Sequence, residues 1–396
     1  MKKGIVFILT LGVFSIINTE MGVVGILPQV AERYGVPVAA AGLLVSLFAL
    51  VVAFAGPTMP LLFSRFQRKK VMVLVLGVFT GCNLVSAFAG SFPVVLAARV
   101  IPAFFQPVYV SIAMSVAAAS VERDQAPKAV SRVMVGVSAG MVLGVPVVSY
   151  IVHQTSLQVG MLFFAAVNAV ALMATIFAVP TMAVGEKLSY GSQLRVLKEG
   201  RVWLSILGVV CLNGSIFGVY SYLSDYLENV THLSAGAVSA LLLVYGLCNI
   251  LGNIIAGRAL SSRPVAFVLV FAPLLGAVYV LLLFLGAFTA PMATLLFVWG
   301  VLAGCAGNIN QYWLSTAAPH APDFANGLFL ASTNLGTTIA TTVCGFFLSA
   351  WGTGSILWGG LLFLLCAFGL LVLRARADKT LQVKNQTILL EGADHP

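Results

Sequence analysis

The stretch GIVFILTLGVFSIINTEMGVVGILP, residues 4–28, is apolar except for one charged residue, Glu20, near its middle. A helix needs about 20 such residues to cross a bilayer. The run is longer than the apolar core of a signal peptide, so we expect a retained first membrane span. An ionised carboxylate at the centre of a span costs about 3 kcal/mol by insertion scales. Glu20 is therefore expected to face a water-filled cavity or a partner.

The composition of the whole chain predicts a polytopic membrane protein. Of the 396 residues, 60% are hydrophobic and 8% are charged, whereas about a quarter of a soluble domain is charged. The six cysteines lie in apolar runs without the spacing of metal ligands, so we expect small buried side chains and no metal site. Phosphate-binding loops and nucleophile motifs do not occur either, which predicts that the protein is not an enzyme and has no cofactor.

The spacing of charged and Pro/Gly/Ser-rich segments predicts twelve membrane helices. Their expected ranges are about 4–28, 39–62, 70–90, 93–119, 129–152, 158–180, 202–228, 235–259, 264–287, 291–318, 323–350 and 354–376. The longest polar stretch between them divides the chain into six plus six. We expect an N-terminal bundle at 1–180, a cytoplasmic linker at 181–201, a C-terminal bundle at 202–376 and a flexible cytoplasmic tail at 377–396.

Basic residues fall almost entirely on one side of this topology. With the N-terminus inside, 19 of the 21 Lys and Arg residues lie in cytoplasmic segments, Arg33 lies outside and Arg99 lies within a span. Cytoplasmic loops carry such an excess of positive charge. Both termini are therefore predicted to be cytoplasmic, and the net charge of +9 needs no nucleic-acid partner.

The two halves also show a weak internal repeat. The stretch AAAGLLVSLFALVVAFAGP (39–57) aligns with AGAVSALLLVYGLCNILGN (235–253) at an offset of 196 residues, which pairs Gly56 with Gly252. Parallel repeats with a solute site between them are typical of one large class of secondary transporters.

The sequence resembles the major facilitator superfamily, and within it the twelve-helix drug/proton antiporters such as arabinose-efflux-like and purine-efflux-like exporters. The resemblance rests on TEMGVVGILPQVAERYGVPVAAAGLLVSLFAL (19–50), LAARVIPAFFQPVY (96–109), GVSAGMVLGVPVVS (136–149) and YSYLSDYLENVTHLS (220–234). It implies an all-α membrane fold of two pseudo-symmetric six-helix bundles that rock about a central cavity. It also implies a location in a bacterial inner membrane.

One loop departs from the pattern of this superfamily. After the second span the family has Gly, then Asp-Arg, then Gly followed by basic residues, whereas here the stretch reads PLLFSRFQRKK (60–70). Pro60, Ser64 and Gln67 replace the Gly, the Asp and the second Gly. The cytoplasmic basic residues are retained, and we expect them to bind helix ends or anionic lipid: Arg65, Arg68, Lys69 and Lys70.

The fifth span carries Gly136, Gly140 and Gly144 at intervals of four, followed by Pro146. On a helix these glycines share one face and let another backbone approach closely. In the resembled family this pattern marks exporters, so we expect a gating and packing role. Ordinary small-residue helix packing is the alternative.

Glu20 and Arg99 are predicted to lie at one depth. From the rise per residue, Glu20 is about 10 Å below the outer end of the first span and Arg99 about 9 Å below the outer start of the fourth. By the resemblance both spans line the cavity. Opposing effects of burial and of a guanidinium can leave a carboxyl titrating near neutral pH, so we expect Glu20 to carry a proton and Arg99 to tune it. A static structural pair, or an Arg99 that holds an anionic substrate, are the alternatives.

Other polar groups are given different roles. Asp225 and Glu228 lie near the outer end of the seventh span and are expected to be exposed at the level of the headgroups. His153, also at an outer helix end, is expected to be interfacial rather than a proton relay. Uncharged amides and aromatic residues near the middle of the spans suit a neutral or weakly polar organic solute. The candidate substrate-binding residues are Asn18, Phe105, Gln106, Tyr109, Met141, Asn213, Phe217, Tyr220, Tyr245, Asn249, Trp299, Asn308, Gln311 and Asn334.

The sequence thus predicts a proton-coupled exporter of small organic solutes, such as drugs, sugars or nucleosides. Protons are the coupling ion, and the expected partners are the solute and the lipid bilayer, with the protein as a monomer. An uptake symporter or uniporter of the same fold is the main alternative. A membrane receptor or embedded enzyme is a weaker one, because clustered interfacial acids and histidines are missing from the sequence.

Overall fold

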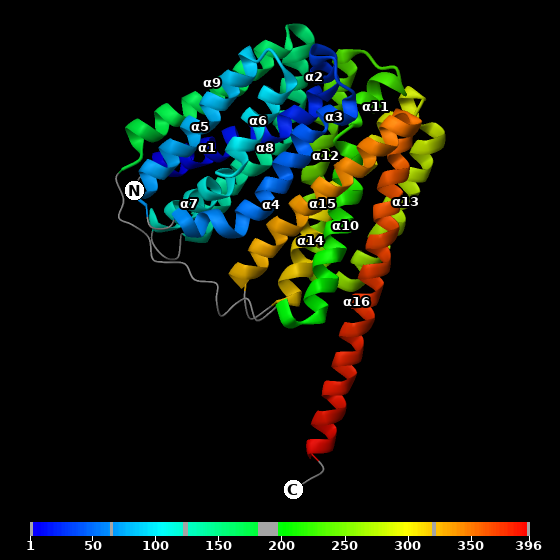
Figure 1. Ribbon diagram of the computed structural model, residues 1–396. Helices are drawn as coiled ribbons and strands as arrows, with labels where there is room; N and C mark the ends of the chain where they lie inside the picture. The colour runs from blue at the N-terminus through cyan, green and yellow to red at the C-terminus, as the bar shows by residue number, and fades with distance from the viewer. Residues whose placement is uncertain (1–2, 64–65, 122–125, 181–196, 319–321, 394–396) are drawn as a thin grey trace.

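The computed structural model describes residues 3–63, 66–121, 126–180, 197–318 and 322–393, and this part of the chain is almost entirely helical (Figure 1). The first half of the chain contains α1 (Lys3–Gly22), η1 (Val23–Ile26), α2 (Leu27–Tyr34), α3 (Val38–Ala41), α4 (Leu43–Phe63), α5 (Arg68–Phe88), α6 (Phe92–Ala103), α7 (Gln106–Ala119), α8 (Ala126–Gln154) and α9 (Leu157–Ala178). The second half contains α10 (Gly200–Tyr220), α11 (Leu223–Asn229), α12 (Ala235–Ser262), α13 (Pro264–Leu285), α14 (Thr289–Ala317), α15 (Pro322–Trp351), η4 (Thr353–Ser355) and α16 (Ile356–Ala393).

Within the described residues, 11 helical segments are long and apolar enough to cross a membrane. Each corresponds to one of the twelve predicted spans. The remaining predicted span, 323–350, forms α15, which has 30 residues. This helix carries the hydroxyl-rich stretch ASTNLGTTIATT (331–342), which lowers its hydropathy.

Helix contacts follow the halves of the chain. In the first half α1 packs against α8 and α9, and α5 packs against α9. In the second half α10 packs against α15 and α16, and α12 packs against α14. The halves are joined mainly by α4 with α15 and by α8 with α12, and also by α3 with α15 and by α11 with α2 and η1. Figure 1 shows the same division, with the blue and cyan helices on one side and the green to red helices on the other.

Several predicted spans are interrupted rather than continuous. The first span changes from α1 to the 3-10 helix η1 and then to α2, and the seventh changes from α10 to α11. These two breaks fall at matching places in the two halves, as expected of an internal repeat. The fourth span breaks between α6 and α7, where Pro102 and Pro107 flank the junction.

The predicted cytoplasmic segments are described only in part. Residues 181–196 of the linker, together with Ser64 and Arg65, lie outside the described residues. In the stretch 377–396, predicted as a flexible tail, the backbone continues as helix α16 through Ala393, and Figure 1 shows this red helix running beyond the other helices.

Candidate functional site

The break in the first span places Glu20 in the last turn of a helix. Carbonyl groups in the final turn of an α-helix have no donor within that helix, and α1 ends at Gly22. The chain then tightens into η1, and Pro28 stands in the first turn of α2. Carbonyl oxygens next to Glu20 are therefore open to a donor from outside the helix.

Arg99 is that donor. Its two terminal nitrogens donate to the carbonyl oxygens of Thr19, at 2.6 Å, and Glu20, at 2.5 Å. The buried guanidinium also lies over the ring of Phe48, 4.7 Å from its centroid. A cation at the C-terminal end of α1 faces the negative end of the helix dipole. Arg99 thus stabilises the helix break itself.

The Glu20 carboxylate has a different partner. Its Oε2 atom accepts a hydrogen bond from Nε2 of Gln106, the first residue of α7. Within the described part of the chain, no nitrogen of Arg99 lies within 4.0 Å of the carboxylate oxygens. The structure therefore brings Glu20, Arg99 and Gln106 together, but it joins Arg99 to the backbone and Gln106 to the acid. The Glu20 side chain is half-buried.

The turn of α1 that precedes Glu20 is also held by two amides that the sequence analysis does not identify. Nδ2 of Asn168 donates to Oγ1 of Thr19 at 2.8 Å and to the carbonyl oxygen of Ser15 at 3.3 Å. Asn83 donates to the same hydroxyl at 3.4 Å. In the sequence, Asn83 and Asn168 are marked only as amides within otherwise apolar spans. These contacts fix the turn that carries Glu20.

The glycines of α8 pack against the backbone of α1. A Cβ atom on Gly136 would lie 2.4 Å from the carbonyl oxygen of Thr10, and one on Gly140 would lie 2.8 Å from Cβ of Ile17. Gly144 faces Asn18 in the same way, and Pro146 is buried two residues further on. The predicted close approach thus occurs between two helices of the first half.

The remaining candidate residues of the first half lie in different environments. Asn18 and Tyr109 are buried, and the Tyr109 hydroxyl lies where a side chain on Gly12 would be. Phe105 is half-buried and packs edge-on against Phe63. Met141 is exposed. Of the candidate residues of the first half, Gln106 is the one that hydrogen-bonds to the Glu20 side chain within the described part of the chain.

Four of the candidate residues of the second half form one aromatic cluster. Tyr220 and Tyr245 stack with centroids 4.7 Å apart, Phe217 packs edge-on against Tyr220, and Trp299 packs edge-on against Tyr245. Tyr279, which was not among the predicted residues, joins through Trp299. The cluster is buried except at Phe217.

Two of the candidate amides of the second half donate hydrogen bonds to backbone carbonyl oxygens of α15. Asn213 donates to the carbonyl oxygen of Thr333 at 2.7 Å, and Asn334 donates to the carbonyl oxygen of Leu330 on its own helix at 2.9 Å. Gln311 is exposed. Asn249 and Asn308 form a separate group with a third asparagine.

The halves contact one another at the predicted outer end. Glu228 of α11 accepts a hydrogen bond from Gln29 of α2 at 3.2 Å and lies 3.5 Å from Nε2 of His153. Deeper along the α8–α12 contact, Ser239 donates to Ser149 at 3.1 Å. Glu228, which was expected to be exposed, is half-buried, because it pairs with Gln29 and His153 across the two halves.

Asp225 is also buried rather than exposed. Its carboxylate accepts hydrogen bonds from Thr353 at 2.7 Å and from Asn229 at 2.9 Å, and its exposed fraction is 3%. The sequence placed it correctly near a helix end. The contact with Thr353 could not be predicted, because it joins segments 128 residues apart.

The basic residues after the second span lie at the start of a helix. Arg68, Lys69 and Lys70 form the first turn of α5 and are partly or fully exposed. Positive charge is unfavourable at a helix N-terminus. This position favours binding to anionic headgroups over the capping of helix ends.

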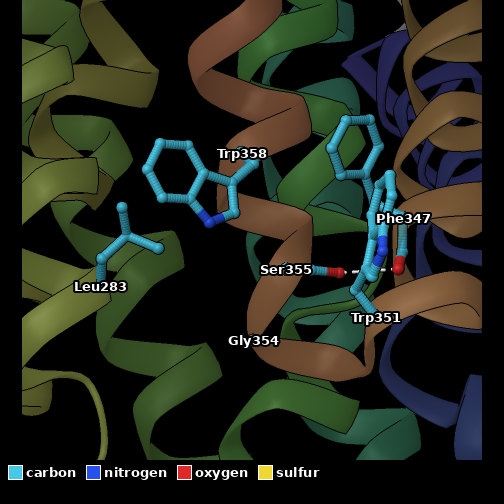
Figure 2. Close-up of a pocket in the computed structure, with 6 residues that line it drawn as sticks. All are labelled: Leu283, Phe347, Trp351, Gly354, Ser355 and Trp358. Carbon is cyan, nitrogen blue, oxygen red and sulfur yellow. Dashed lines mark hydrogen bonds between the residues drawn. The ribbon is translucent and has the colours of Figure 1, made fainter.

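A surface pocket of about 560 Å³ lies far along the chain from these residues. Figure 2 shows Ser355 directed at the carbonyl oxygen of Phe347, to which it donates at 2.7 Å. The indoles of Trp351 and Trp358 are exposed, as is usual where a membrane protein meets the headgroup region. The pocket is lined by Leu283, Phe347, Trp351, Gly354, Ser355 and Trp358.

Comparison with known proteins identifies the family. Residues 9–329 match the model of the Major Facilitator Superfamily. The chain is 31% identical over 373 residues to the uncharacterized MFS-type transporter YtbD of Bacillus subtilis (strain 168), covering 91% of this chain and 93% of that protein. It is 23% identical over 338 residues to a probable sugar efflux transporter of Mannheimia succiniciproducens, covering 84% and 83%.

A solved structure shows the same fold. The crystal structure of the nucleoside transporter NupG superposes with a TM-score of 0.74 at 15% sequence identity, covering 94% of this chain and 98% of the other. The relatives are transporters rather than enzymes. This chain is a multi-pass membrane protein that belongs to the major facilitator superfamily.

Proposed function

We propose that the protein is a proton-coupled exporter of small uncharged organic solutes, in which Glu20 carries the proton. The observation that carries the proposal is the placement of this acid. Its carboxylate is half-buried within a span and is bound by the neutral amide of Gln106. A neutral donor leaves the carboxylate free to take up a proton without breaking an ion pair, whereas a tight guanidinium pair would resist that change.

Arg99 has a positioning role in this proposal. By holding the carbonyl oxygens of Thr19 and Glu20 it fixes the helix break and the direction of the Glu20 side chain. The amides of Asn83 and Asn168 hold the same turn through the hydroxyl of Thr19. Because the backbone is fixed, protonation of Glu20 changes only the hydrogen bond between its carboxyl group and Gln106.

Alternating access requires contacts between the halves that can open. The contacts of Gln29, His153 and Glu228 join the halves at the predicted outer end, and in this proposal they close that end. We propose twelve spans with α15 as the eleventh, two six-helix bundles, and both termini on the cytoplasmic side of a bacterial inner membrane. The protein would act as a monomer with protons as its sole coupling ion.

Export is favoured over uptake by the relative named as a probable sugar efflux transporter and by the glycine pattern of α8. The test uses everted membrane vesicles that hold a respiration-driven pH gradient, with a fluorescent acridine as the reporter. A panel of sugars, nucleosides and uncharged drugs is added one at a time. An exported solute should dissipate the gradient only in vesicles that contain the protein. Accumulation of the same solutes by whole cells, without an effect on vesicles, would instead indicate uptake.

A further inference from the structure

Three asparagines from two helices form a continuous group in the second half. Nδ2 of Asn253 donates to Oδ1 of Asn249 at 3.2 Å and to its carbonyl oxygen at 3.0 Å. Nδ2 of Asn308 donates to Oδ1 of Asn253 at 2.6 Å and to the carbonyl oxygen of Gly304 at 3.1 Å. Asn253 thus links the other two, which were separate candidates in the sequence.

The backbones beneath this group are held at a fixed separation. A Cβ atom on Gly304 would lie 2.0 Å from the carbonyl oxygen of Asn249, and one on Gly252 would lie 1.9 Å from that of Val301. Sγ of Cys305 also donates to the carbonyl oxygen of Gly252 at 3.3 Å. Such direct backbone contact leaves α12 and α14 little freedom to shift, so the amides project from a rigid base.

The group faces the other half of the chain. A Cβ atom on Gly246 would lie 2.9 Å from the carbonyl oxygen of Val142, so this face of α12 touches α8. Asn253 follows Gly246 by two helical turns and shares its face. Because the helices run antiparallel, it lies level with Val135, which is 60% exposed. Asn253 is exposed as well, so here the two helices stand apart.

The chemistry of the group suits uncharged hydroxyl groups. Helix α14 and the part of α12 before Arg258 contain no charged residue. Within the described residues, Nδ2 of Asn249 and Oδ1 of Asn308 have no hydrogen-bond partner. An amide offers both donors and an acceptor, and a hydroxyl group needs one of each. Neighbouring amides can therefore satisfy two hydroxyl groups on adjacent carbon atoms.

We propose that Asn249, Asn253 and Asn308 form a binding subsite for a vicinal diol on an uncharged solute. This inference rests on the proposed transport function, which brings a solute between the halves. The ordinary alternative is that the amides only join α12 to α14, as polar residues often do in membrane bundles.

The test is binding to the purified full-length protein in detergent, measured by calorimetry, which does not depend on proton coupling. The probes are uridine against 2′-deoxyuridine and myo-inositol against cyclohexanol, because the second member of each pair lacks a vicinal diol. We expect the wild-type protein to bind at least one diol about tenfold more tightly than its partner, since one to two hydrogen bonds are lost. Asn253→Leu should abolish that discrimination, and Leu251→Ala, a truncation on another face of the same helix, should retain it.

Two outcomes overturn the proposal. One is a wild-type protein that fails to discriminate within either pair. The other is an Asn253→Leu protein that discriminates normally with a lower melting temperature, which means that the amides only join the helices. If this variant cannot be purified, Asn249→Ala replaces it under the same expectations. Because binding is measured without a pH gradient, the discrimination is expected even if proton coupling is lost or was never present.

Discussion

The guanidinium of Arg99 donates to the backbone carbonyl oxygen of Glu20 at 2.5 Å, while the carboxylate of the same residue is bound by Gln106. The backbone of Glu20 therefore binds a cation, whereas its side chain binds a neutral amide. The backbone contact fixes the helix break, and the side-chain contact leaves the acid free to change its protonation state. The roles of the two groups can be separated by mutation.

Replacing Arg99 should lower stability before it changes coupling. Arg99→Ala removes two charge-assisted hydrogen bonds to Thr19 and Glu20 and the contact with Phe48. We expect a loss of about 2 kcal/mol, typical of buried hydrogen bonds to charged groups, seen as a lower melting temperature in detergent. Arg99→Lys should recover only part of it, because an ammonium lacks the planar fork. An Arg99→Ala protein as stable as wild type but without coupling would show that Arg99 acts on the carboxyl charge instead.

The glycine face of α8 should be sensitive to a single added methyl group. In Gly136→Ala the new Cβ would lie 2.4 Å from the carbonyl oxygen of Thr10, so the backbones of α8 and α1 must separate. We expect a cost of about 2 kcal/mol, as for other overpacked sites, and a lower yield of monodisperse protein. Gly77→Ala in α5 is the matched control, because no atom lies within 4 Å of its added Cβ. Equal melting temperatures for both variants would contradict the packing described here.

The contact of α8 with α12 should control closure of the predicted outer end. A leucine at Gly246 would push against the carbonyl oxygen of Val142 and separate the halves. In a background without native cysteines, Ser149→Cys supplies a buried thiol next to Ser239. An impermeant maleimide should label this thiol from outside about tenfold faster when Gly246→Leu is present, as a population shift predicts. Gly236→Leu, where nothing lies within 4 Å, should leave the labelling rate unchanged, and equal rates in both would refute a closing role for this contact.

The sequence predicted the helical spans well, because a bilayer demands long apolar segments and few other patterns satisfy that demand. It also predicted that Glu20 and Arg99 would lie together, from depth and from resemblance. The spacing of Gly136, Gly140 and Gly144 correctly indicated a close backbone approach. Each of these features follows from local periodicity or from the cost of a charge in lipid.

Other features depend on contacts that no local pattern encodes. The change from α1 to η1 at residues 23–26 carries no breaker other than Gly25 and the following Pro28, so one continuous helix was expected. The contact between His153 and Glu228 depends on how the two halves pack together. From the sequence alone, both residues were interpreted as ordinary interfacial groups. Asn253 was not among the candidate residues, because its role depends on a hydrogen bond from Asn308 on another helix.

The central claim, that Glu20 carries the proton, is tested most directly with Glu20→Gln protein in proteoliposomes. The solute is the one that dissipates the pH gradient in everted vesicles, and its transport is measured with and without an imposed pH gradient. Glutamine keeps the shape of the protonated acid but cannot release a proton. We predict that the variant still binds the solute and equilibrates it down its own gradient, while uphill transport driven by the pH gradient disappears. A Glu20→Gln protein that concentrates the solute against its gradient at near the wild-type rate would contradict the account and leave Glu20 a structural residue of the helix break.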